Sequence, residues 1–346
     1  MKQLTLDGFY TWSIFSEMRQ IDFNGHLWTR PQGNILIDPV PMSDADLKRL
    51  KQLGGVSLIV ITNRDHEREA DAFRKRFGAA VAAHEADAPL LSMQVERTIA
   101  DGEEIESGMR AVRLEEGKSP GEIALYFPEH NAVLAGDLIA GEPMGRLSML
   151  PDEKLANPAK AALELRKILR LQPDVILVGD GHSIFHDASR RLVECLQSRS
   201  DIYINRINMD ELEEGFTAEI GHLIGAQNLG YMLWRLEPGQ FNCPFHFHHF
   251  DEEAAIVMEG ECLMRTDRGE FMIRKGDFIA FPPGRSGAHQ FINKGSERCV
   301  LFLLGEEHPH MVCEYPDSEK IVARPIHGAF RKKDAVGYWD GEERRQ

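Results

Sequence analysis

The chain shows two patterns of hydrophobic and polar positions, one in each part of its length. Up to about residue 200, short apolar runs alternate with stretches in which apolar residues recur every three or four positions. The run at residues 56–62 is typical of a strand covered on both faces, and residues 43–53 are typical of a helix capped by Ser43 and ended by glycines. Strands and helices that alternate in this way predict an α/β domain built in layers.

The same patterns predict the remaining elements and the domain boundary. Further strands are expected at residues 10–15, 25–28, 33–38, 80–83, 122–127, 132–138 and 174–178, and further helices at 66–77, 157–169 and 186–198. From Gly230 onward the helical pattern stops, and only short strands with glycine and proline turns remain. We therefore expect an α/β domain at residues 1–200, a polar linker at 201–218 and an all-β domain with a C-terminal tail at 219–346.

Composition and charge narrow the classes of partner. The 346 residues are 42% hydrophobic and 27% charged, which is typical of a soluble globular protein of two domains. The formal net charge of −15 argues against nucleic acid or an anionic membrane surface as a partner. The five cysteines include no CxxC pair, and the chain has neither a signal-peptide pattern nor an apolar run of membrane-spanning length. These features predict a cytoplasmic protein with reduced cysteines.

Four residues with metal-binding side chains stand out in the all-β part. His246 and His248 lie two apart, so in a strand both imidazoles leave the same face. Glu253 follows after enough chain to reverse direction, and His289 lies on a later extended run. Three imidazoles and one carboxylate form a mixed nitrogen and oxygen site suited to one divalent transition metal, namely Fe, Mn, Ni, Co, Cu or Zn.

At these positions the sequence resembles the cupin family. The first cupin motif (G, five residues, HxH, three or four residues, E, six residues, G) matches residues 239–260 with one additional residue before His246. The second (G, five residues, PxG, two residues, H, three residues, N) matches residues 276–293 with two additional residues before His289. The resemblance implies a double-stranded β-helix, the cupin jelly roll, with His246, His248, Glu253 and His289 as metal ligands.

Alternation along the strands predicts which neighbouring side chains face the metal. His249 and Glu252 are offset by one position from the ligands, so we expect them to point outward. We expect an apolar interior, formed by Ala255, Val257, Phe278 and Phe291. The C-terminal aromatic pair, Tyr338 and Trp339, is expected to be buried near the barrel mouth.

The α/β part resembles the metallo-β-lactamase fold, an αββα sandwich, in the order of four loops, three of which follow strands. The family's motif THxHxDH would fall on residues 62–68, its HTPG-like loop on 118–121, its GD on 136–137 and its GH near 179–182. The matched positions depart from the family's ligands, because they hold Asn63, Asp65, Glu67, Arg68, Lys118 and Asp180. Only Asp137 keeps the residue type that the family uses.

These replacements predict that the dinuclear metal site is lost. Arg68 and Lys118 would place cations where metal ions bind, and like charges repel. Three alternatives follow: ion pairs of these cations with Asp137 or Asp180, an anion-binding cleft, or a different mononuclear site. The side chains available for such a mononuclear site are His66, His182, Asp65, Asp137 and Asp180.

The favoured function is therefore a metal-dependent enzyme of oxygenase, isomerase or lyase type, which acts in the cupin domain on a small polar or anionic metabolite. One alternative is a metabolite-binding or sensor protein without catalysis, and another is a metallo-hydrolase that uses the N-terminal domain. The expected partner is a small molecule, with neither nucleic acid nor membrane, and a homodimer is the expected assembly.

Overall fold

The computed structural model describes residues 1–212, 214–326 and 328–342, and the chain divides into two compact units, Met1–Ile204 and Asn205–Gln346. The division falls inside the stretch expected as a linker. Residues just beyond it already belong to the second unit, since Leu212 packs in a hydrophobic cluster with Ile220 and Leu233.

The N-terminal unit contains two main β-sheets. The first has seven strands in the order of the chain: β1 (Lys2–Gln3), β2 (Phe9–Ser16), β3 (Ile21–Trp28), β4 (Ile35–Ile37), β5 (Leu58–Ile61), β6 (Ala80–His84) and β7 (Arg97–Ile99). The second has five strands in the order β14 (Val175–Val178), β11 (Ala132–Ala135), β10 (Ile123–Phe127), β9 (Met109–Arg113) and β8 (Glu104–Glu106). A small hairpin joins β12 (Ile139–Ala140) to β13 (Ser148–Met149).

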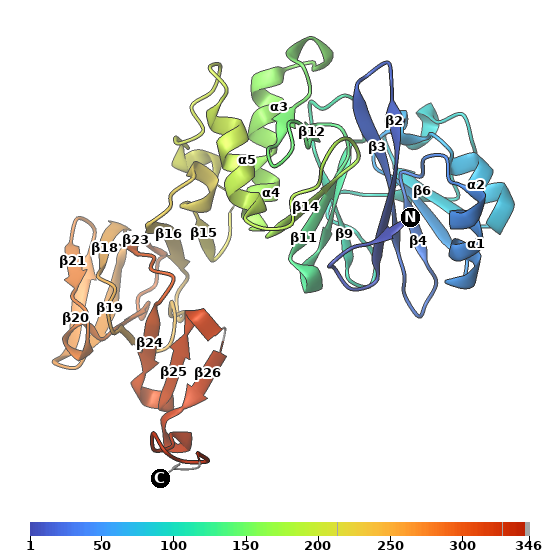
Figure 1. Ribbon diagram of the computed structural model, residues 1–346. Helices are drawn as coiled ribbons and strands as arrows, with labels where there is room; N and C mark the ends of the chain where they lie inside the picture. Colours follow the sequence, from blue (N-terminus) through green and yellow to red (C-terminus); the bar gives the residue numbers. More distant parts are fainter. Residues whose placement is uncertain (213, 327, 343–346) are drawn as a thin grey trace. The chain divides into compact units, whose positions relative to one another are not determined.

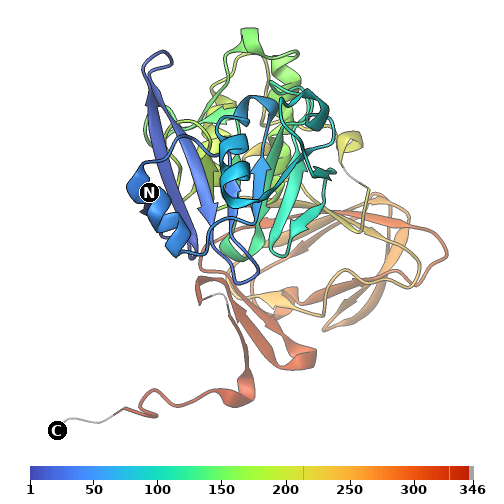
Figure 2. The same ribbon diagram turned by 90° about the vertical axis from the view of Figure 1, so that its right-hand side faces the viewer.

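Three hydrophobic clusters show how these sheets are layered. One cluster lies between the sheets and includes Val60 of β5 and Leu125 of β10. A second joins the other face of the first sheet to α1 (Asp44–Gln52) and α2 (Ala70–Phe77), which are the blue helices in front of the strands in Figure 2. The third joins the other face of the second sheet to α3 (Pro158–Glu164), α4 (Arg166–Arg170) and α5 (Ala188–Gln197). The predicted αββα sandwich is therefore confirmed (Figure 1).

Two predicted helices differ from the structure. The helix expected at residues 66–77 begins only at Ala70, because Arg68, just after the 3₁₀ turn Arg64–His66, has a left-handed backbone with φ 36°. The helix expected at 157–169 is broken at Leu165 into α3 and α4. The first difference places His66 in a turn at the end of β5 instead of on a helix.

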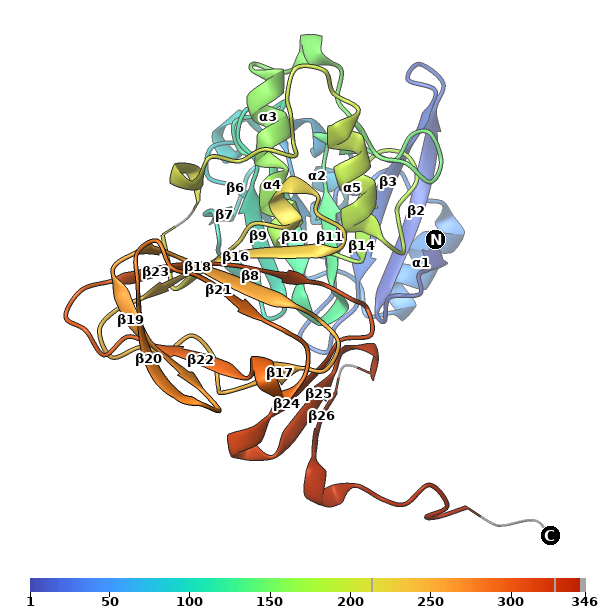
Figure 3. The ribbon, with the colours of Figure 1, turned by 90° about the vertical axis from the view of Figure 1, so that its left-hand side faces the viewer.

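The C-terminal unit is built almost wholly of strands, most of which Figure 3 labels. A five-stranded sheet has the order β15 (Thr217–Glu219), β16 (Leu229–Leu236), β23 (Cys299–Glu306), β18 (Glu253–Glu259) and β21 (Phe278–Phe281). A three-stranded sheet has the order β20 (Gly269–Arg274), β19 (Glu261–Thr266) and β22 (His289–Ile292). A four-stranded sheet has the order β17 (Phe247–His248), β24 (Val312–Tyr315), β25 (Lys320–Ala323) and β26 (Gly328–Arg331).

Two expectations for this unit are wrong. Phe278 does not belong to the interior, since it is 65% exposed and the register places Phe281 of the same strand inside, opposite Glu253. The aromatic pair of the tail is also exposed, at 86% for Tyr338 and 52% for Trp339. The two rings instead pack edge to face against each other, 5.1 Å between centroids.

Within the described residues, every helix is too short or too polar to cross a lipid bilayer.

Candidate metal centre and a metal-free counterpart

The four predicted ligands of the C-terminal unit come from the starts of three strands. His246 and His248 flank Phe247 at β17, Glu253 opens β18 and His289 opens β22. His246 and His289 form an antiparallel bridge, which holds their rings side by side. The two additional residues before His289 are accommodated by the 3₁₀ turn Arg285–Gly287, so the ligand still arrives at the strand start. We refer to His246, His248, Glu253 and His289 as the barrel site.

The carboxylate of Glu253 lies at the centre of the barrel site. One of its oxygens is 3.4 Å from Nε2 of His248, and the other is 3.9 Å from Nε2 of His246 and 3.7 Å from Nε2 of His289. These separations are those of ligands arranged around a common ion with bonds of about 2.0–2.2 Å. Glu253 fits because it faces Gly305 on β23, where a β-carbon would lie only 3.1 Å from its Cγ.

Backbone carbonyls orient two of the imidazoles. Nδ1 of His289 lies 2.9 Å from the Gly287 carbonyl oxygen, and Nδ1 of His246 lies 3.1 Å from that of Pro244. A carbonyl only accepts, so each Nδ1 carries the hydrogen and each Nε2 presents its lone pair to Glu253. Nε2 of His289 is buried and has no hydrogen-bond partner within the described structure. A metal ion would satisfy that atom, so the residues fit a metal.

Asp251 lies behind the third imidazole, beyond hydrogen-bond distance, and sequence reasoning missed it. Its Oδ2 lies 3.6 Å from Nδ1 of His248, and its Oδ1 accepts from Nδ1 of His308 at 2.6 Å. The carboxylate is buried, with 2% of the residue exposed. The negative charge of a carboxylate behind a metal-binding histidine increases the basicity of the ring. The signal in the sequence was an acidic residue three positions after a ligand.

Burial sets the protonation states of the barrel site. Burial and the neighbouring His246 lower the pKa of His289 to about 3, and burial with His248 lowers the pKa of His246 to about 4. Burial and Asp251 raise the pKa of Glu253 to about 7. The imidazoles are therefore neutral at neutral pH, as metal ligands must be.

Two further side chains touch the barrel site. Cys313 lies opposite His248 in the pairing of β17 with β24, and its sulphur, with one nitrogen each of His246 and His248, forms a group within 4.8 Å. Burial raises the pKa of the Cys313 thiol to about 12, so it is protonated in the absence of metal. Phe281 stacks on the His289 ring at 3.7 Å between centroids and excludes water from that side.

The barrel site lies in a cavity of about 300 Å³. One part of the wall is apolar, with Tyr231, Trp234 and Leu303. Another part carries Glu219, Glu306, Glu307 and Arg324. As the alternation predicts, the neighbours of the ligands point elsewhere: Glu252 is exposed, and His249 lies 3.3 Å from Glu314.

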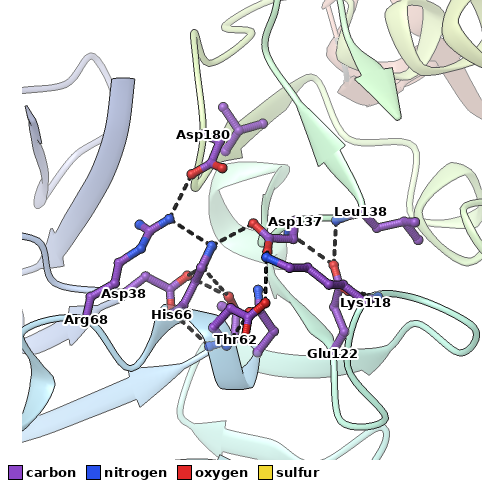
Figure 4. A network of polar contacts seen from close by, with 12 residues as sticks. Asp38, Thr62, His66, Arg68, Lys118, Glu122, Asp137, Leu138 and Asp180 are labelled. Atoms are coloured by element: carbon purple, nitrogen blue, oxygen red, sulfur yellow. Dashed lines mark hydrogen bonds and ion pairs between the residues drawn. The ribbon is translucent and has the colours of Figure 1, made fainter. Parts of the chain in front are cut away.

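The N-terminal unit holds a second cluster of polar residues where its strands end (Figure 4). His66 lies between two carboxylates, with Nδ1 2.8 Å from Asp38 and Nε2 2.7 Å from Asp137. Arg68 binds Asp180 at 2.8 Å. Lys118 lies 2.8 Å from Asp137 and 2.6 Å from Asp65. We refer to these seven residues, Asp38, Asp65, His66, Arg68, Lys118, Asp137 and Asp180, as the N-terminal polar network.

The cations of this network offset most of the charge of its four carboxylates without a metal ion. Burial opposes the charged imidazole, but Asp137 and Asp38 outweigh it and raise the pKa of His66 to about 10. Burial alone would raise the pKa of Asp137. His66 and Lys118 outweigh burial and hold the pKa of this carboxyl well below its usual range. His66 is thus an imidazolium between both carboxylates, and Nη2 of Arg68 lies 2.9 Å from its Nε2. One nitrogen or oxygen each of His66, Asp137 and Asp180 lie within 4.8 Å of one another, but both aspartates already pair with a cation, Asp180 with Arg68 and Asp137 with Lys118.

The other predicted residues of this cluster have local roles. Asn63 accepts from the backbone N–H of Asp65 and caps the turn, and Glu67 accepts from Ser92. Among the described residues, His182 joins no group of potential metal ligands. Sequence reasoning missed Asp38, which ends the third predicted strand, and Glu122, whose pKa burial and Asp137 raise to about 7.

Comparison with known proteins agrees with this architecture. The profile of the metallo-beta-lactamase superfamily matches residues 1–199, more than half of the chain. The chain belongs to the metallo-beta-lactamase superfamily. The profile of the cupin domain matches residues 232–305, so this member of the superfamily carries a cupin domain in its C-terminal unit. Both resemblances drawn from the sequence are confirmed, and domains of both kinds generally bind metal ions.

Individual relatives cover one domain each. A hydroxyacylglutathione hydrolase of Cereibacter sphaeroides is 28% identical over 181 residues, which are 51% of this chain and 67% of the hydrolase. A sugar phosphate isomerase of the cupin superfamily from Silicibacter pomeroyi DSS-3 is 25% identical, covers 39% of this chain and 98% of its own, and gives a TM-score of 0.35. A metallo-beta-lactamase family protein of Thermus thermophilus is 18% identical, covers 55% of this chain and 79% of its own, and gives a TM-score of 0.44.

Proposed function

We propose that the cupin domain binds one divalent transition metal at the barrel site and uses it to act on a small oxygen-bearing metabolite. The observation that carries the proposal is the buried Nε2 atom of His289, which has its lone pair directed at Glu253 and no hydrogen-bond partner in the described structure. Leaving such an atom unsatisfied costs about 1–3 kcal/mol. A metal ion would remove that cost and would engage His246, His248 and Glu253 as well.

The residues around the barrel site would have different roles in binding the ion and the small molecule. When bound, the ion would polarise a carbonyl or carboxylate oxygen of the ligand. His246, His248 and His289 would hold the ion, with the rings of His246 and His289 oriented by the carbonyls of Pro244 and Gly287 and the charge of Asp251 behind His248. The cavity of about 300 Å³ beside them has room for a small molecule. Phe281, which stacks on His289, keeps one side of the site dry.

We further propose that the N-terminal domain acts as a scaffold and not as a hydrolase. The hydrolase alternative is supported by the similarity to the hydroxyacylglutathione hydrolase of Cereibacter sphaeroides, which is 28% identical over 181 residues. Against it stand Arg68 and Lys118, which are bound to Asp180 and Asp137 at 2.8 Å each. Two metal ions would have to displace both of these cations and the proton of His66, and the aspartates would then lose their present partners.

Elemental analysis of protein purified without added metal tests both proposals. We expect about one transition-metal ion per chain, lost in His246→Ala/His248→Ala and kept in Asp137→Asn. Metal that persists in the barrel double variant would exclude the barrel site. Two ions per chain, of which Asp137→Asn removes at least one, would favour the hydrolase instead. If assays of the metal-loaded protein find ligand binding without turnover, the result would favour the alternative of a metabolite-binding or sensor protein without catalysis.

A further inference from the structure

The cavity beside the barrel site has an unequal charge distribution. Its wall carries five carboxylates and one guanidinium, which belong to Glu219, Asp251, Glu253, Glu306, Glu307 and Arg324. Arg324 is already paired, since its Nη1 lies 3.3 Å from Glu307. Glu253 faces the proposed metal, and Asp251 is bound to His308 at 2.6 Å.

Glu219 and Glu306 each have only a histidine nearby as a possible cation, His222 for Glu219 and His308 for Glu306. Within the described residues neither forms an ion pair; Glu219 accepts only from the Gly221 amide and Glu306 only from the Glu252 amide. Burial raises the pKa of Glu219, with Glu307 adding to the effect and His222 opposing it. Two carboxylates that form no ion pair beside a cavity repel an anionic ligand and attract a cationic one.

Two glycines without side chains form part of the cavity wall. Gly230 of β16 and Gly305 of β23 face each other in the sheet, and both line the cavity. The cavity also contains the unpartnered Nε2 of His289, whose residue is 1% exposed, so a metal ion at this nitrogen and a cationic group at the carboxylates would each find a partner in the same space. The part of the wall that carries Glu219 and Glu306 thus belongs to the same cavity as the barrel site, where a buried nitrogen has no partner.

On this basis we infer that the cavity takes a small molecule with an oxygen-donor group for the metal and an ammonium group for Glu219 and Glu306. The inference rests on the proposed function and specifies its substrate class. If the oxygen-donor group of the small molecule is an anion, the positive charge of the metal would neutralise it. A second anionic group would face the carboxylates, so dicarboxylates and phosphorylated metabolites are disfavoured.

Three hydroxamic acids with the same metal-binding head and different tails test the inference: 3-aminopropanohydroxamic acid, butanohydroxamic acid and succinic monohydroxamic acid. Isothermal titration of the zinc-loaded full chain measures each affinity. We expect the ammonium probe to bind about tenfold more tightly than the neutral probe, and the carboxylate probe to bind most weakly. High salt should narrow these differences, because screening weakens charge interactions.

Variants test whether Glu219 and Glu306 cause the preference for the ammonium probe. Glu219→Gln/Glu306→Gln should remove most of the preference for the ammonium probe and keep the zinc content. The matched control Glu261→Gln/Glu297→Gln removes two exposed carboxylates outside the cavity wall and should keep the preference. If the double variant fails to fold, the salt series on the unmodified protein still decides the question.

The outcomes separate this inference from the proposed function. Equal or tighter binding of the carboxylate probe, or no probe binding to protein that holds zinc, overturns the inference alone. A preference that survives in Glu219→Gln/Glu306→Gln also overturns it. Failure of the protein to take up zinc at the barrel site overturns the proposed function itself.

Discussion

Nε2 of His289 lies 3.7 Å from a carboxylate oxygen of Glu253, although the two groups come from strands in different sheets. The separation is too long for a hydrogen bond and too short for the two groups to be unrelated. The hydrogen on Nδ1, held by the Gly287 carbonyl, leaves Nε2 as an acceptor that faces another acceptor. Such a pair is stable only with a cation between its members or a proton on Glu253.

Replacing His289 should abolish tight metal binding. In His289→Ala we expect the affinity for zinc to fall by more than about 100-fold, since losing only a residue behind a ligand costs about 10–100-fold. Competition with a chromophoric chelator measures the change. His249→Ala is the matched control, because His249 is a neighbouring imidazole that contacts Glu314 instead of the site. An equal loss in the control would contradict the ligand assignment.

Asp251 should influence the metal without touching it. Asp251→Asn keeps the shape of the side chain but removes the charge that faces Nδ1 of His248 at 3.6 Å. We expect zinc affinity to fall by about tenfold with the stoichiometry unchanged. Glu252→Gln changes an exposed neighbouring carboxylate and should have no effect on the same titration. Complete loss of zinc from Asp251→Asn would instead make Asp251 a direct ligand.

The glycine pair at the cavity wall gives a sharper test of geometry. In Gly305→Ala the new β-carbon would lie 3.1 Å from Cγ of Glu253, so Glu253 must shift and metal affinity should drop. In Gly230→Ala the closest atom lies 3.8 Å away, so metal affinity should stay the same. Zinc titrations of the two variants, with circular dichroism to check folding, compare them directly. Equal zinc affinity in both variants would show that the position of Glu253 does not matter.

Much of the fold and of the barrel site could be predicted because the signals are local. Two histidines two residues apart share a face of a strand wherever that strand lies, and Ser43 caps its helix as its position predicts. The partners that order the sites could not be predicted in this way. Asp38 meets His66 from 28 residues away, and Arg324 enters the cavity from a later strand end. The inward prediction for Phe278 failed because the pairing of β18 with β21 directs Phe281 inward instead.

The N-terminal polar network predicts a specific dependence of stability on pH. The folded pKa of His66, about 10, lies above its ordinary value of 6.5, so its stabilisation is full below about pH 6.5 and is lost as pH rises through 10. Asp137 behaves oppositely: its lowered pKa stabilises the fold above the unfolded value, and this contribution is lost in acid. Hydrogen exchange of peptides that contain β5 and β11, corrected for intrinsic rates, should show protection that falls from pH 6.5 to pH 10.

Variants of His66 and a surface histidine isolate this contribution. His66→Gln leaves Asp38 and Asp137 without their shared cation and should destabilise the N-terminal unit by about 3–5 kcal/mol. His186→Gln removes an exposed histidine that lies 3.3 Å from Asp174, and it should cost less than about 1 kcal/mol. If His66→Gln kept the pH dependence of the unmodified protein, another group would have to be responsible.

The most direct measurement is anomalous X-ray diffraction from crystals of the metal-loaded protein, recorded above and below the absorption edge of the bound metal. The account predicts one strong anomalous peak per chain, at about 2.0–2.2 Å from Nε2 of His246, His248 and His289 and from a carboxylate oxygen of Glu253. It also predicts no peak between Asp137 and Asp180. A peak in the N-terminal polar network, with none at the barrel site, would contradict the account.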